Sequence, residues 1–209
     1  MCDACRLSRR RLLRLMTLGA LLFPLAPARA ANDAVNAASN ANNAGDAGDA
    51  GNGQRPAGAP RLHLPKPGEH DACPVCGMFP ARYYEWIATI VFTDGTAVHF
   101  DGAKDAFKFW LNMSKYDPKK HTQADVKEFG VTAYYSTEMI DAKKALYVIG
   151  SDVLGPMGHD LIPHPDMYDA RAFMKDHHGK AIVRFEDIDM QMLKGLDRGE
   201  FIVHGKRLK

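Results

Sequence analysis

Two short segments of this chain carry side chains that suit a soft metal ion. The first reads CPVCGM and runs from Cys73 to Met78. Its thiolate and thioether sulfurs are soft donors, which favour copper(I) over hard cations. The glycine between Cys76 and Met78 has no Cβ, so both sulfurs can approach one ion from an extended loop. The segment therefore predicts soft-metal binding through Cys76, with Met78 and Cys73 as secondary candidates.

Three other interpretations of this segment stay open. Cys73 and Cys76 could close a small disulfide loop, which an oxidising compartment favours. Cys-Pro-x-Cys-Gly is also common in zinc half-sites, but a four-ligand zinc site normally needs a second pair of ligands, and the chain has no second Cys-x-x-Cys. A thioredoxin-type redox motif needs a preceding strand, whereas prolines and Gly68 precede Cys73.

The second segment reads GPMGH and runs from Gly155 to His159. Methionine often fills gaps in a core, but Met157 is flanked by proline and glycine in a predicted loop, where packing is a less natural reason for it. An extended backbone points residues i and i+2 the same way, so Met157 and His159 can face one ion. His164 lies in the same predicted loop and is the alternative to His159. Together the two loops predict a copper(I) site of low coordination number.

The chain divides into three predicted parts. Residues 1–30 have the basic stretch, apolar run and small-residue cleavage site of a secretory signal, either an ordinary Sec signal or one of the twin-arginine type. Residues 31–60 are almost entirely Ala, Asn, Asp and Gly, which predicts a disordered linker. Residues 61–209 contain all nine histidines and form the predicted metal-binding domain. Export to the periplasm follows from the signal.

Charge and motifs exclude several classes of function. The net charge is +2, and no basic patch with interleaved aromatic residues follows the N-terminal arginines, so the sequence does not predict nucleic-acid binding. The chain also lacks a Gly-x-Ser-x-Gly elbow, a phosphate-binding loop and a dinucleotide fingerprint. We therefore expect a binding protein and not an enzyme.

Hydrophobic periodicity and turn signals predict an α+β domain. The dipeptide Asp94-Gly95 predicts a hairpin between strands at 86–92 and 96–100. Helical spacing follows, with Asp101 as the expected capping residue. The remaining predicted elements are strands at 131–136, 145–149 and 181–185, a helix at 166–178 ended by Gly179, and a helix at 186–196. The order strand, strand, helix occurs twice, which predicts two similar β-β-α modules packed together.

From about Asp71 to Ile188, these motifs resemble the NosL family of nitrous oxide reductase accessory proteins. The resemblance rests on Cys76-Gly77-Met78, the hairpin and helix through Trp110, the strand at 147–149 with Ser151-Asp152, and the Gly-Pro-Met-Gly run at 155–158. It implies a periplasmic copper(I) chaperone that supplies the tetranuclear copper-sulfide centre of nitrous oxide reductase, together with a membrane ABC-type maturation complex.

The resemblance also implies a ligand set and a fold. The family's cysteine, methionine and histidine ligands correspond to Cys76, Met157 and His159. The implied fold is a pair of similar α+β modules, also found in an organomercurial lyase. Typical members carry a lipobox cysteine after the apolar run, where this chain has residues 28–31, Ala-Arg-Ala-Ala, so a lipid anchor is not expected. A disulfide-bonded adaptor without metal, a zinc-binding domain and a cysteine-dependent enzyme are the alternatives.

Overall fold

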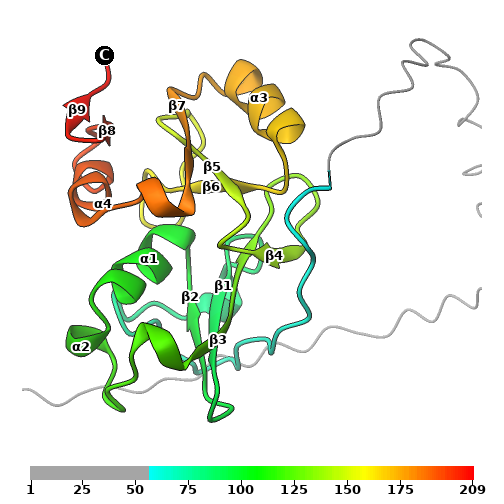
Figure 1. The fold of residues 1–209 in the computed structure, drawn as a ribbon, viewed down its shortest axis with the longest axis vertical. Coiled ribbons are helices and arrows are strands. Elements are labelled where there is room, and N and C mark those ends of the chain that lie inside the picture. The colour runs from blue at the N-terminus through cyan, green and yellow to red at the C-terminus, as the bar shows by residue number, and fades with distance from the viewer. Residues whose placement is uncertain (1–56) are drawn as a thin grey trace, which may run out of the picture. The chain divides into compact units, whose positions relative to one another are not determined.

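The computed structural model describes residues 57–209, whose two main antiparallel sheets are each accompanied by a helix (Figure 1). The first sheet has the strand order β2-β1-β3-β4. The elements of this first half are β1 (Ala88–Phe92), β2 (Ala97–Phe100), α1 (Ala103–Leu111), α2 (Met113–Tyr116), β3 (Val126–Thr132) and β4 (Met139–Asp141). The predicted hairpin is confirmed, because Gly95 turns the chain with a positive φ and its amide donates to the Phe92 carbonyl, 3.0 Å away.

The second sheet has the order β6-β5-β7. The elements of this second half are β5 (Leu146–Ile149), β6 (Ile162–His164), α3 (Met167–Asp176) and β7 (Ala181–Arg184), followed by α4 (Met190–Leu196) and the small hairpin of β8 (Ile202–Val203) and β9 (Lys206–Arg207). In each half, a strand pairs with the next strand, a helix follows, and a third strand pairs with the other edge of the first. The predicted pair of β-β-α modules is thereby confirmed.

Strand β5 lies at the centre of the second sheet and is buried on both faces. Successive strand residues point to opposite faces. Tyr147 and Ile149 accordingly belong to the main core, whereas Leu146 and Val148 belong to a smaller cluster around Phe173 of α3. The main core includes residues of both halves: the Phe107 ring of α1 lies 5.2 Å from the ring of Tyr147. The two halves therefore share one core.

Several predicted boundaries are wrong. Strand β3 begins at Val126, inside a segment predicted to be irregular, because β1 pairs with it as far as Val126 although Lys127 and Glu128 are polar. Residues 133–136 form a turn instead of continuing the strand. In the predicted final helix, 186–196, a 3-10 turn at Phe185–Asp187 precedes α4, which is capped by the Asp189 carboxylate.

The end of α3 also differs from the prediction. His178, not Gly179, has the positive φ of the residue that follows the helix. The Gly179 amide donates to the Met174 carbonyl at 3.0 Å, which completes the termination. A Cβ on Gly179 would lie 2.4 Å from Val148 Cγ1, so the glycine is needed for the close approach to β5.

The predicted signal at 1–30 and most of the predicted linker at 31–60 lie outside the described residues. The packed chain includes Ala59, which is buried and whose amide donates to the Pro165 carbonyl at 2.6 Å. Within residues 57–209, none of the helices has the length and apolar character needed to cross a membrane.

Candidate metal centre

The Cys73–Met78 segment forms a closed turn. The Gly77 amide donates to the Cys73 carbonyl at 2.8 Å, and the Cys73 amide donates to the Met78 carbonyl at 2.7 Å. Gly77 has a φ of 80°, which glycine adopts without steric cost. The turn also aims backbone amides at sulfur, because those of Val75 and Cys76 face the Cys73 thiol and that of Met78 faces the Cys76 thiol. Such amides favour thiolate over thiol.

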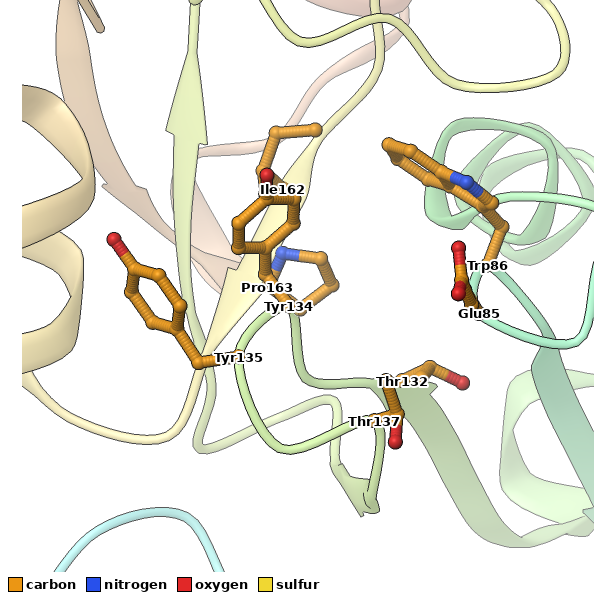
Figure 2. Close-up of a pocket in the computed structure, with 8 residues that line it drawn as sticks. All are labelled: Glu85, Trp86, Thr132, Tyr134, Tyr135, Thr137, Ile162 and Pro163. Atoms are coloured by element: carbon orange, nitrogen blue, oxygen red, sulfur yellow. The ribbon is translucent and has the colours of Figure 1, made fainter. Parts of the chain in front are cut away.

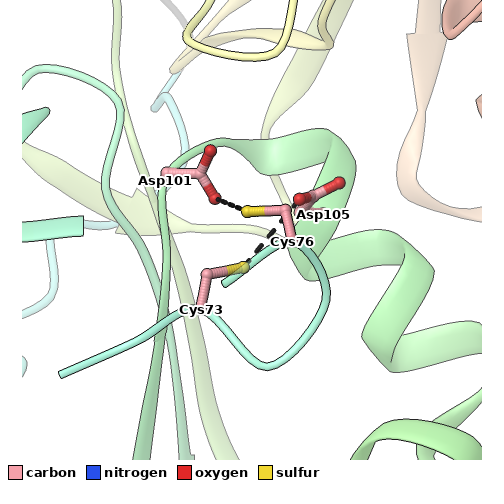
Figure 3. A group of neighbouring side chains, drawn as sticks. All are labelled: Cys73, Cys76, Asp101 and Asp105. Atoms are coloured by element: carbon pink, nitrogen blue, oxygen red, sulfur yellow. Dashed lines mark hydrogen bonds between the residues drawn. The ribbon is translucent and has the colours of Figure 1, made fainter. Parts of the chain in front are cut away.

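Two carboxylates from the start of α1 complete this cluster (Figure 3). The Cys76 thiol donates to Asp101 Oδ1 at 3.1 Å, and the Cys73 thiol points to Asp105 Oδ2 at 3.8 Å. One ligand atom from each of these four residues lies within 4.8 Å of the others. We call Cys73, Cys76, Asp101 and Asp105 the dithiol–dicarboxylate cluster.

Asp101 does not cap α1 as predicted. The N-cap residue is Gly102, and Asp101 turns its carboxylate to Cys76 instead. The first turn of the helix is capped from the second half of the chain, because Asp160 Oδ1 accepts from the Lys104 amide at 2.7 Å. A Cβ on Gly102 would lie 2.3 Å from Asp160 Oδ2. The glycine at the N-cap therefore makes room for a carboxylate that is distant in sequence.

Burial and negative charge keep both thiols protonated in the absence of metal. Desolvation is the main cause that raises the pKa of Cys73 to about 11, and the neighbouring Asp101 and Asp105 raise it further. Desolvation also raises the pKa of Cys76 strongly, with an added contribution from its hydrogen bond to Asp101. Both cysteines are free, so the structure does not contain the disulfide considered as an alternative. A metal that binds here has to displace the thiol protons.

The Gly155–His159 segment is a tight loop that exposes its methionine. The amides and carbonyls of Gly155 and Gly158 are paired in both directions, at 2.8 and 3.0 Å. Met157, between them, is 43% exposed, which agrees poorly with a packing role. The loop is fastened to α1, because the buried Lys104 ammonium donates to the Met157 carbonyl at 2.8 Å and lies 3.2 Å from Asp197.

We call the Cys73–Met78 turn the cysteine loop and the Gly155–His159 segment the methionine loop. Both loops meet the same end of α1. The cysteine loop contacts Asp101 and Asp105, and the methionine loop contacts Lys104. Asp160, which follows the methionine loop, caps the same turn of the helix. The sequence analysis missed Lys104 and Asp160. For Lys104 the sequence contained one signal: a lysine lies in the first turn of the predicted helix, where carboxylates are more favourable.

The two candidate histidines lie in different surroundings. His159, the last residue of the methionine loop, is half-buried, and its ring packs edge-on against Phe201 at 5.0 Å. His164 was predicted to lie in the loop, and this is wrong: it is the last residue of β6 and is fully buried. Its ring lies 4.8 Å from that of Phe173, and desolvation lowers its pKa to about 4.

The secondary candidate Met78 is half-buried, and its carbonyl closes the cysteine turn.

A pocket of about 300 Å³ lies where the two halves meet (Figure 2). Its walls come from the ends of β3 and β6 and from the segment before β1; the lining residues are Glu85, Trp86, Thr132, Tyr134, Tyr135, Thr137, Ile162 and Pro163. The Trp86 ring also backs the methionine loop, since a Cβ on Gly155 would lie 3.2 Å from it. Trp86 thus lies against the start of this loop.

Comparison with known proteins gives three findings. Residues 66–193 match the NosL family model. The chain is 29% identical over 137 residues to the copper-binding lipoprotein NosL of Stutzerimonas stutzeri, a match that covers 60% of this chain and 66% of that protein's length. The crystal structure of the copper chaperone NosL from Shewanella denitrificans has the same fold, with a TM-score of 0.50 and 24% identity over 63% of this chain and 99% of that one. Since the family model spans more than half of the sequence, this chain belongs to the NosL family.

Proposed function

We propose that this protein is an exported copper(I) chaperone that carries one ion between its cysteine loop and its methionine loop. The observation that carries the proposal is the fastening of both loops to the start of α1, the cysteine loop through Asp101 and Asp105 and the methionine loop through Lys104. The relatives' names, a copper-binding lipoprotein and a copper chaperone, support a copper cargo and not an enzymatic activity.

The proposed ligands are Cys76, Met157 and His159. Soft sulfur donors favour copper(I), and an imidazole is a suitable third ligand. One thiolate with a neutral thioether and a neutral imidazole gives an uncharged complex. Met157 is exposed, so the ligands of a receiving protein can reach the ion and displace this protein's ligands one at a time.

The proposed recipient is nitrous oxide reductase, whose tetranuclear copper-sulfide centre needs copper during assembly, with a membrane ABC-type maturation complex as a second partner. The periplasm is the proposed location, because residues 1–30 have the pattern of an export signal. A lipid anchor is not part of the proposal, since residues 28–31 hold no cysteine.

Competition with a chromophoric copper(I) chelator, carried out without oxygen on the full chain, tests the ligand set. We expect one copper(I) per wild-type chain and a loss of affinity of about 100-fold or more in Cys76→Ser, because the only charged ligand is removed. Met157→Leu should weaken binding by about tenfold or more, whereas Met167→Leu, a half-buried methionine of α3, should not. Unchanged affinity in both Cys76→Ser and Met157→Leu would overturn the proposal.

A transfer experiment tests the recipient. Copper(I)-loaded protein is mixed with nitrous oxide reductase that lacks copper, and the copper content of each is measured after separation. We expect transfer to be faster than from a small-molecule copper(I) complex of equal affinity. An equal rate from both donors would contradict delivery by a specific complex.

A further inference from the structure

The pocket where the two halves meet has no role in the proposed copper site, yet its lining is that of a small-molecule site. Glu85, Tyr135 and Thr137 are exposed at its mouth. The half-buried side chains of Trp86 and Tyr134 lie on opposite sides of it (Figure 2). The rest of the lining is buried and uncharged: Thr132, Ile162 and Pro163. A largely apolar interior with a few polar groups is typical of ligand pockets, and about 300 Å³ suits a small ligand.

The two aromatic walls are held in place by the fold. The Trp86 amide donates to the Tyr83 carbonyl at 2.8 Å, and the Tyr134 amide donates to the Pro163 carbonyl of β6 at 3.0 Å. Both rings pack against the smaller hydrophobic cluster, where the Tyr134 ring meets that of Phe173 edge-on at 4.7 Å. A ligand that enters between the walls therefore does not have to order them first.

The charges at the mouth favour a cation. Among the described residues that line the pocket, Glu85 is the only charged one, and the Tyr84 hydroxyl occupies just one of its two oxygens, Oε1, at 3.0 Å. Partial burial is the main cause that raises the pKa of Tyr135, and the carboxylates of Asp176 and Asp169 raise it further. The mouth thus lies in a negative field. The faces of aromatic rings add to the attraction for a cation.

The hydrogen-bonding groups narrow the kind of cation. Thr132 Oγ1 donates to the Ile87 carbonyl at 2.7 Å, and Thr137 Oγ1 donates to the Ser136 carbonyl at 2.7 Å. Neither hydroxyl is left to donate to an anion. A guanidinium would bring five N–H donors, for which Glu85 is the only carboxylate in the lining. A quaternary ammonium has no N–H donor and needs only aromatic faces and a nearby negative charge.

The turn at the mouth supplies a separate indication of a ligand site. Thr137 has a φ of 55°, and a β-branched residue rarely adopts this left-handed conformation. The conformation is fixed by the Thr137 amide, which donates to the Ala133 carbonyl at 2.9 Å. Backbone strain of this kind is found preferentially at ligand-binding and catalytic sites.

We propose that this pocket binds a quaternary ammonium group, with its alkyl groups between the rings of Trp86 and Tyr134 and its charge near Glu85. Cation–π attraction to the two rings and the charge of the carboxylate supply the selectivity. The proposal does not rest on the copper function, because none of these three residues is a proposed copper ligand.

Isothermal titration calorimetry of the full chain tests the proposal, with choline as the probe. The comparison ligand is its uncharged isostere, in which carbon replaces the nitrogen, so that shape is kept and charge is removed. We expect one choline per chain, bound at least about tenfold more tightly than the isostere. No binding of choline, or equal affinity for both ligands, would overturn the proposal. This comparison needs no variant, so it does not depend on how a substitution affects folding.

Variants locate the site. Glu85→Gln and Trp86→Leu should each lower the affinity for choline by about tenfold, because one removes the charge and the other an aromatic face. Glu186→Gln, an exposed carboxylate outside the pocket, is the matched control and should bind choline as the wild type does. Unchanged affinity in Glu85→Gln would overturn the placement of the cation.

Sedimentation with phosphatidylcholine vesicles distinguishes the two sources of a quaternary ammonium group. Cosedimentation that excess choline reverses would assign the pocket to a lipid headgroup. Choline binding without cosedimentation would assign it to a free quaternary ammonium compound.

Discussion

The two halves of this domain share one plan but join strand to helix in different ways. In the second half, Asp166 follows β6 and caps its own helix, with Oδ1 accepting from the Asp169 amide at 2.9 Å. In the first half, Asp101 follows β2 but faces Cys76, and α1 is capped by Asp160 from the other half. The second junction caps its own helix, whereas capping from outside leaves Asp101 to accept a hydrogen bond from the Cys76 thiol.

The largest expected effect concerns Asp160 and pH. Burial raises the pKa of Asp160 to about 7 from an ordinary value of 3.8. The folded state therefore holds a proton that the unfolded state has lost, so this group's stabilisation is complete at low pH and is lost as the pH rises through about 7. Relative to Asp160→Asn, the wild type should lose about 1.4 kcal/mol of unfolding free energy for each pH unit between pH 3.8 and about 7.

Urea unfolding of the wild type and Asp160→Asn at several pH values measures this difference. Asparagine keeps an oxygen for the amides of Lys104 and Leu161, so the variant should fold. A stability difference that does not depend on pH would show that Asp160 is ionised in the folded protein.

Gly102→Ala tests the external cap. The new methyl group would lie 2.3 Å from Asp160 Oδ2, so the carboxylate has to move from the first turn of α1. We expect a loss of about 2–3 kcal/mol of unfolding free energy. Gly205→Ala is an instructive comparison, because its positive φ strains alanine although space is open around it. If Gly102→Ala costs no more than Gly205→Ala, the close contact with Asp160 is not important.

Lys104→Met removes the ammonium that holds the Met157 carbonyl while keeping most of the side-chain volume. We expect copper(I) affinity to fall by about tenfold, since residues that orient ligands typically contribute this much. The effect should disappear in a Met157→Leu background, because the lysine acts through that loop. An equal loss in both backgrounds would mean that Lys104 only stabilises the fold. Lys175→Met, an exposed change in α3, is the control.

The smallest effect is expected in the second half. Asp166→Ala removes the side-chain cap of α3 and should cost about 1 kcal/mol of unfolding free energy. Copper(I) affinity should stay at the wild-type value, because the Asp166 carboxylate accepts from an amide of α3 in the second half. Weaker copper binding in Asp166→Ala would remove the distinction between the two junctions.

The sequence predicted those features that depend on local patterns. The Asp94-Gly95 hairpin and the repeated β-β-α order are confirmed because turn chemistry and periodicity determine them. Asp101 was predicted as a cap because its position is right for one, but Asp160, far away in sequence, accepts from the Lys104 amide of α1 and Asp101 faces Cys76 instead. The short strand β6, with His164, was missed for the same reason: pairing with β5 creates it.

The candidate ligands were identified by residue type, and their surroundings were not. Soft-donor chemistry selected Cys76, and the resemblance to the NosL family added most of the weight for Met157, whereas the carboxylates beside the thiols and the lysine that contacts the methionine loop required the fold. Asp101 and Asp105 lie 25 or more residues from Cys76 in sequence, so no spacing rule connects them.

X-ray absorption at the copper edge of the copper(I)-loaded chain, compared with Met157→Leu, tests the central claim most directly. A site shared by the two loops predicts sulfur scattering from two atoms and nitrogen scattering from an imidazole in the wild type, with one sulfur lost in the variant. An identical sulfur contribution in both proteins would contradict a copper ion held between the cysteine loop and the methionine loop.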